Sequence, residues 1–146
     1  MAILNEEQEM LRDMAREWAT NESPVAAFRK VRNEKPAEGY STDAFATMAQ
    51  MGWTGIVIPE EYGGMAADFL YSTVVIEEIG RLGLTGIGFS LHSDIVAPYI
   101  LHYGSEALKH KYLPKLVSGE MVTAIAMTEP GAGSDLQGVK TTAVLD

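Results

Sequence analysis

The chain has 146 residues, of which 47% are hydrophobic, and its 11 basic and 20 acidic side chains give a formal net charge of −9. This composition excludes a disordered or fibrous protein and predicts a globular unit with a substantial core. The acidic excess disfavours a nucleic-acid-binding surface, because phosphate contacts need clustered lysine and arginine. Since there is no cysteine, a disulfide framework, a thiolate nucleophile and a cysteine-ligated zinc site are excluded, and redox chemistry would need a cofactor.

The N-terminal residues Met1–Glu7 contain neither the basic region nor the apolar stretch of a signal peptide. No segment is long and apolar enough for a membrane span. We therefore expect a cytoplasmic protein, with neither nucleic acid nor a lipid bilayer as a partner.

The first predicted helix begins after Asn5, which can cap it with Gln8 as the capping-box partner. Apolar residues then recur at the spacing of one helical face that should pack inward: Leu11, Met14, Ala15 and Trp18. The helix should end near Ser23 and Pro24. Residues 25–39 follow as a connection whose conformation the sequence does not determine.

A second helix is predicted to start at Ser41 or Thr42 and to end before Gly52, which suits the C′ position. Its inward residues are Phe45, Met48 and Ala49. Between Gly52 and Gly64 the sequence predicts a turn, a short buried extended run at residues 56–58, and another turn.

Asp68 is predicted to cap a third helix, whose core-facing residues are Tyr71, Val74, Val75, Ile79 and Leu82. Glu77 and Glu78 diverge by about 100° around its axis, so they cannot converge on one substrate atom. We assign both glutamates to a solvated face.

Further helices are predicted from about residue 88 to the region of Ser118. Pro98 should kink the first of them or restart it, because its ring excludes a helical hydrogen bond. Gly104 and Ser105 should end one helix and cap the next. Residues 1–119 are thus expected to form a helical domain and residues 120–146 the beginning of a β-domain, so that the chain is mainly α.

The most informative segment is Ala126–Gly138, which we call the glycine loop. Apolar, β-prone runs precede and follow it, so it is expected to join two strands. Gly131 and Gly133 lack a Cβ and could adopt positive φ, which lets a ligand approach the main chain closely. The spacing fits neither the Rossmann fingerprint nor the P-loop, which both need a helix directly after the glycines.

Residues Met127–Asp135 read M-T-E-P-G-A-G-S-D and resemble the signature of the acyl-CoA dehydrogenase family. Two further stretches match the family's N-terminal domain: Gly52-Trp53 followed by P-E-E-Y-G-G at 59–64, and Gly104-Ser-Glu followed by K-Y-L-P-K-L at 111–116. Residues 86–138 look most like the long-chain branch. The resemblance implies a helical N-terminal domain and the opening strands of a middle β-domain.

The family resemblance implies FAD as the cofactor and a cofactor-binding segment from Ile125 to Ser134, comprising Ile125, Ala126, Met127, Thr128, Glu129, Pro130, Gly131, Ala132, Gly133 and Ser134. Thr128 would donate its hydroxyl near flavin N5 and O4. Ser134 would also contact the substrate, together with Phe89 and Ser93. Many members carry tyrosine or phenylalanine at Ile125. The catalytic glutamate would lie outside this chain, which is assigned no catalytic residue.

The resemblance further implies an acyl-CoA substrate, an electron-transferring flavoprotein as partner, and a dimer or tetramer. Two alternatives are a non-catalytic helical subunit or interaction module, and a flavin oxidase or monooxygenase on the same fold.

The three histidines lack metal-ligand spacing, so no metal site is expected. His92 either approaches a pocket beside Ser90 and Ser93 or is purely structural, and His102 and His110 should lie on exposed faces.

Overall fold

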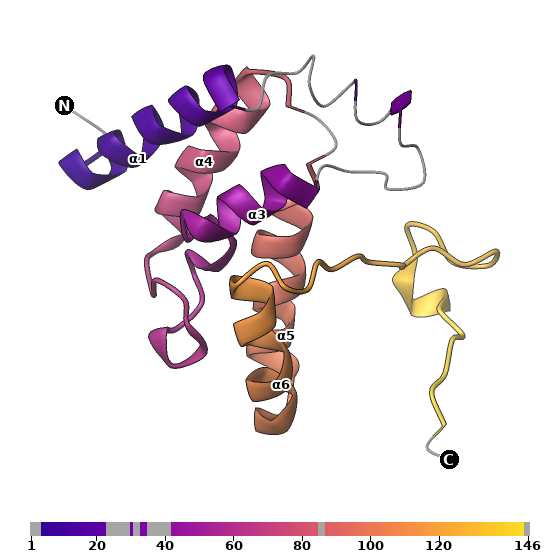
Figure 1. Cartoon of the computed structure of the whole chain (residues 1–146). Coiled ribbons are helices and arrows are strands. Elements are labelled where there is room, and N and C mark those ends of the chain that lie inside the picture. The colour runs from indigo at the N-terminus through magenta and orange to yellow at the C-terminus, as the bar shows by residue number, and fades with distance from the viewer. Residues whose placement is uncertain (1–3, 23–29, 31–32, 35–41, 85–86, 145–146) are drawn as a thin grey trace.

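A computed structural model describes residues 4–22, 30, 33–34, 42–84 and 87–144. The prediction of a mainly helical chain is confirmed (Figure 1). The predicted connection at 25–39, apart from residues 30, 33 and 34, and the cap at Ser41 lie outside the described residues. The helices are α1 (Glu6–Glu17), η1 (Trp18–Glu22), α3 (Thr42–Gln50), η2 (Trp53–Gly55), η3 (Glu60–Tyr62), α4 (Phe69–Arg81), η4 (Leu91–Val96), α5 (Ala97–Tyr103), α6 (Glu106–Val117) and η5 (Leu136–Gly138).

The start of α1 follows the sequence prediction. The Gln8 amide donates to Asn5 Oδ1 at 2.8 Å and the Asn5 amide donates to Gln8 Oε1 at 3.0 Å, which closes the capping box. Ala15 and Trp18 are buried where α1 packs on α4, but Met14 is 49% exposed, so its inward assignment was wrong. Met14 lies about 60° around the helix from Leu11, outside the buried stripe.

The segment after α3 is buried as predicted but is not extended. Gly52 has φ +78° and ends α3 in the left-handed conformation expected of a C′ glycine. Instead of an extended run, the chain forms the 3₁₀ helix η2 and a turn, with the amide of Ile58 donating to the Gly55 carbonyl at 3.2 Å. Burial of Ile56 and Ile58 requires only that their side chains face the core, which a compact turn also achieves.

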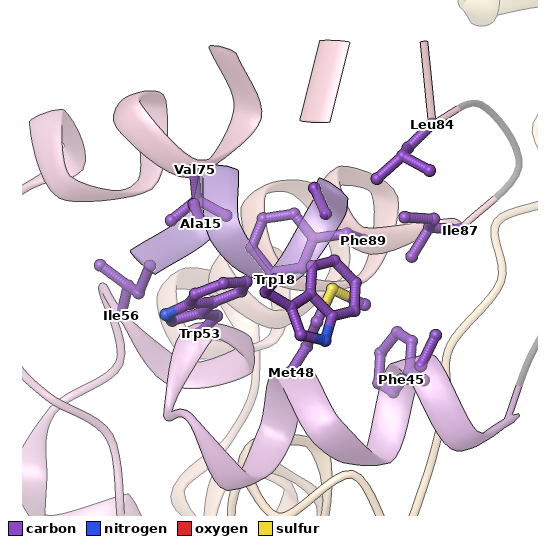
Figure 2. Packing of buried hydrophobic residues seen from close by; sticks show 12 residues of the cluster. Ala15, Trp18, Phe45, Met48, Trp53, Ile56, Val75, Leu84, Ile87 and Phe89 are labelled. Carbon is purple, nitrogen blue, oxygen red and sulfur yellow. The ribbon is translucent and has the colours of Figure 1, made fainter. Parts of the chain in front are cut away.

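Two clusters of buried apolar side chains hold the helices together. The larger one joins α1, η1, α3, η2 and α4, and Figure 2 shows its side chains converging: Ala15, Trp18, Ala19, Ala44, Phe45, Met48, Trp53, Ile56, Val75, Leu84, Ile87 and Phe89. Within it, the rings of Trp18 and Trp53 pack edge to face, with their centroids 5.5 Å apart. The smaller one joins the 58–62 segment to α5 and α6: Ile58, Tyr62, Ala97, Leu113 and Leu116.

Glu78 contradicts the prediction of a solvated face, because its side chain is buried whereas its neighbour Glu77 is exposed. Arg16 of α1 donates to both Glu78 oxygens, at 2.8 and 3.1 Å, and Arg81 donates to Oε2 at 3.2 Å. The hydrogen bond from Arg16 is the main reason that the pKa of the Glu78 carboxyl lies below its ordinary value. The glutamate therefore ties α4 to α1.

Pro98 lies in the first turn of α5, directly after the π-helical segment η4. The Ala97 amide donates to the His92 carbonyl, five residues back. Proline has no N–H to donate, and the wider π turn before it accommodates the missing hydrogen bond. The helix therefore restarts at this point, as predicted.

After α6 the chain leaves the helices. We call the described residues 4–22, 42–84 and 87–121 the helical body, and residues 122–144 the tail (Figure 1). The two strands predicted around the glycine loop, at 121–127 and 140–145, are not formed: the described residues 121–127 and 140–144 have no strand structure. A strand depends on a neighbouring strand to pair its backbone, and the described residues offer none. None of the described helices is both long and apolar enough to cross a bilayer.

Candidate functional site

The glycine loop is folded by hydrogen bonds of its own. Glu129 and Ala132 exchange two backbone bonds of 2.9 and 3.1 Å, so Pro130 and Gly131 form a tight turn between them. Asp135 then caps the short helix η5 by accepting from the Gln137 amide at 3.1 Å. The loop is therefore structured although it lies apart from the helical body (Figure 1).

The Glu129 carboxylate holds the outgoing chain against the loop. It accepts from the backbone amides of Lys140 at 2.8 Å and Thr141 at 2.9 Å, and from the Thr141 hydroxyl. These bonds, above all the one from the Thr141 hydroxyl, keep the pKa of the Glu129 carboxyl below its ordinary value. The side chain of Glu129 is thus engaged within the loop, as are its amide and carbonyl, which pair with Ala132, and its predicted cofactor contact stays a prediction.

The glycines of the loop have different functions. Gly131 and Gly133 do not have positive φ, contrary to the conformation that we considered for them. A Cβ placed on either would meet nothing within 4 Å, so their main chain is open on one side. A Cβ on Gly138 would lie 3.2 Å from the Gly131 carbonyl oxygen, so Gly138 lets the loop close on itself.

The side chains around the open glycines are mostly exposed. Ile125 is 42% and Met127 52% exposed, and Thr128 and Ser134 are exposed residues as well. Ala132 is the exception, being buried inside the loop. The segment thus presents apolar side chains, hydroxyls and bare main chain in close sequence, and its assignment to a cofactor stays a prediction.

The predicted substrate residues Phe89 and Ser93 lie in the helical body, not beside the loop. Phe89 belongs to the larger cluster. Ser93 is buried and its hydroxyl has no partner among the described residues. Their substrate role stays a prediction.

Asp94 is a half-buried polar group that the sequence analysis missed. Its Oδ1 accepts from the Ser72 hydroxyl of α4, and its Oδ2 is buried without a partner among the described residues. Burial is the main cause that raises the pKa of the Asp94 carboxyl. No sequence signal marked it, since the buried partner Ser72 lies 22 residues away on another helix.

His92 is fully buried, and both of its ring nitrogens are engaged by Leu116 and Thr123. It is therefore structural rather than a group lining an accessible pocket. His102 and His110 are exposed, as predicted. The described part of the chain holds no group of three histidine, aspartate or glutamate residues that could bind a metal ion.

Comparison with known proteins identifies the architecture. Residues 5–120 match the family model of the acyl-CoA dehydrogenase N-terminal domain. The long-chain specific acyl-CoA dehydrogenase of Rattus norvegicus is 41% identical over 141 residues, covering 97% of this chain and 32% of the rat protein.

Solved structures agree. The acyl-CoA dehydrogenase of Geobacillus kaustophilus superposes with a TM-score of 0.82 at 44% identity, over 99% of this chain and 37% of that one. The Bacillus anthracis acyl-CoA dehydrogenase, solved in complex with FAD, gives a TM-score of 0.83 at 30% identity, over 94% of this chain and 23% of that one. The present chain therefore spans between 23% and 37% of the length of these relatives.

Proposed function

This chain belongs to the acyl-CoA dehydrogenase family, whose N-terminal domain its residues 5–120 match, and on that premise we propose that it forms the N-terminal part of an FAD-dependent acyl-CoA dehydrogenase. The reaction is the α,β-desaturation of a fatty acyl-CoA, as in β-oxidation. The observation that carries the proposal is the glycine loop, which keeps the family's signature and exposes it directly after a folded N-terminal domain in the chain.

The loop fits a flavin on three counts. Its main chain is open at Gly131 and Gly133, where a Cβ would meet nothing within 4 Å. Ile125 and Met127 offer exposed apolar surface to a flat ring. The hydroxyls of Thr128 and Ser134 are exposed and can donate to ring and phosphate oxygens. When bound, FAD supplies the acceptor for the substrate's β-hydride.

The residues of this chain would bind and orient, without removing the α-proton. Thr128 would fix the ring edge near N5, and Ser134 would contact both cofactor and CoA thioester. Phe89 and Ser93 would line the acyl chain's path, and the catalytic base lies in another part of the protein. We further propose an electron-transferring flavoprotein as the electron acceptor, a homo-oligomeric assembly and a cytoplasmic location.

The test uses the full-length protein that contains this chain. We expect it to purify with FAD, and the flavin absorbance to bleach on anaerobic addition of acyl-CoA. Thr128→Val, which removes a hydroxyl at constant shape, should weaken FAD binding about five- to tenfold. The matched change Thr20→Val, on the exposed surface of η1, should leave binding unchanged.

Other outcomes decide between the alternatives. Rapid oxygen consumption with acyl-CoA would indicate an oxidase or monooxygenase. A full-length protein that neither binds FAD nor bleaches with acyl-CoAs of any chain length would contradict the proposal and favour the non-catalytic helical module.

A further inference from the structure

His92 connects three parts of the structure through one buried ring. It lies in η4 with no exposed surface. Its Nε2 is 3.1 Å from the Leu116 carbonyl oxygen in the last turn of α6. Its Nδ1 is 3.2 Å from the Thr123 amide nitrogen and 3.1 Å from the Thr123 hydroxyl, both in the tail. The edge of the ring packs against Phe45 of α3, with centroids 4.8 Å apart.

These partners determine the form of the imidazole. The Leu116 carbonyl can only accept, so Nε2 must carry the hydrogen that donates to it. The Thr123 amide can only donate, so Nδ1 must present its lone pair. Only the neutral ring with hydrogen on Nε2 satisfies both, since a proton on Nδ1 would face the Thr123 N–H.

The hydrogen bonds of His92 link Thr123 to Leu116, and this link lies where the tail leaves the body. Just before it, the Met121 amide donates to the Lys115 carbonyl at 3.0 Å, and Val122 packs against the larger cluster. The five residues that follow, 124–128, are all exposed. At about 3.3 Å per extended residue, Thr128 lies within about 17 Å of chain from this anchor. Because these five residues tether Thr128 to Thr123, the position of Thr123 limits where the glycine loop can lie relative to the helical body.

We propose that His92 is a positioning residue for the glycine loop: by holding Thr123 against α6 in its neutral form, it sets the placement of Thr128 and the loop relative to the helical body. The inference rests on the proposed function, in which that loop forms one wall of the flavin site. His92 would act through Thr123 and would itself touch neither FAD nor substrate.

The ring of His92 gives the link a pH dependence. Its neighbours include the Phe45 side chain from α3, the Leu116 carbonyl from α6 and Thr123 from the tail, and none of these titrates. Burial lowers the pKa of His92 below its ordinary value. The neutral link is therefore still complete at pH 6.5, the ordinary pKa of histidine, and is lost only as the pH falls through the lowered pKa of His92.

Three substitutions separate the two hydrogen bonds in the full-length protein. His92→Phe fills the space and removes both bonds. His92→Asn can place its amide oxygen near the position of Nδ1 and keep the Thr123 bond, whereas His92→Gln reaches toward Nε2 and keeps the Leu116 bond. The matched control is His102→Phe, the same change at an exposed histidine of α5.

We expect His92→Phe and His92→Gln to weaken FAD binding about tenfold, with His92→Asn restoring most of the affinity. The wild-type dissociation constant should stay constant down to pH 6.5 and rise only as the pH falls through the lowered pKa of His92, and that rise should be absent in His92→Asn. In the FAD-free protein, hydrogen exchange of the Thr123 amide should accelerate in the Phe and Gln variants only. If His92→Phe fails to fold, the difference in FAD affinity between His92→Asn and His92→Gln, together with the pH profile of the wild type, still tests the proposal.

The inference is overturned if the variants lower the melting temperature but leave the FAD affinity, its pH profile and exchange at Thr123 as in the wild type, since His92 would then be an ordinary core residue. Failure of the proposed function gives a different result: the wild type binds no FAD, while exchange at Thr123 still reports whether His92 anchors the tail.

Discussion

The helical body and the tail of this chain obtain their structure in different ways. The body buries large side chains from helices far apart in sequence, among them Trp18, Phe45 and Trp53 (Figure 2). The tail is mostly exposed and is shaped by short-range bonds, such as those that Glu129 makes to Lys140 and Thr141. The body can therefore be stable by itself, whereas the tail depends on local hydrogen bonds and should add little to that stability.

The largest expected contrast is in truncated side chains. Phe45→Ala removes a buried ring, 1% exposed, from the larger cluster and should destabilise the full-length protein by about 3–5 kcal/mol. Met127→Ala in the tail removes an exposed side chain and should change stability by less than about 0.5 kcal/mol. Denaturant unfolding measures both, and equal effects would contradict the division into body and tail.

The same substitution, glycine to alanine, can be compared in the body and in the tail. Gly119 has φ +73°, and an added Cβ would lie 2.8 Å from Ala49 Cβ, so Gly119→Ala should cost about 2 kcal/mol. Gly131→Ala meets nothing within 4 Å and should leave the unfolding midpoint unchanged. It should still weaken FAD binding severalfold, because its methyl group occupies the open side of the loop. A Gly131→Ala variant with wild-type FAD affinity would remove that surface from the site.

Acid should act on the body through Glu78. Its pKa is lowered in the folded state, so the stabilisation is present above its ordinary pKa, near 4.5, and disappears as the pH falls through the lowered value. Glu78→Gln should cost about 1 kcal/mol at neutral pH and flatten this acid dependence. Glu77→Gln, the exposed neighbour, is the control in pH-dependent melting. Identical acid profiles for the two variants would show that the Arg16 link is ineffective.

The smallest effect on stability is expected at Glu129. Glu129→Gln weakens the bonds to Lys140 and Thr141, which should loosen the loop and lower FAD affinity a few-fold without shifting the melting temperature. Its pKa is lowered from about 4.5, so these bonds persist at that pH and are weakened only as the pH falls through the lowered value. Glu60→Gln, on the exposed surface of η3, serves as the control in an FAD titration. A large drop in melting temperature would mean that the loop supports the body.

Sequence reasoning succeeded where the cause of a structure is local. Asn5 with Gln8 determines the start of α1, Asp68 starts α4, and Gly52 ends α3, because capping involves only a few neighbouring residues. The signature of the glycine loop was likewise visible in a single stretch of chain.

Predictions failed where the cause lies far along the chain. Glu78 is buried because Arg16, 62 residues away, neutralises it. His92 is engaged because Thr123, 31 residues away, meets its ring. The strands expected beside the glycine loop need a pairing partner, which their own alternation does not supply.

The most direct test of a flavin-binding tail on a self-supporting helical body is hydrogen exchange of the full-length protein with and without FAD. Within this chain, protection by FAD should concentrate on residues 125–134, while exchange in α1, α3 and α4 stays unchanged. Unaltered exchange at 125–134 in protein that has bound FAD would contradict the account.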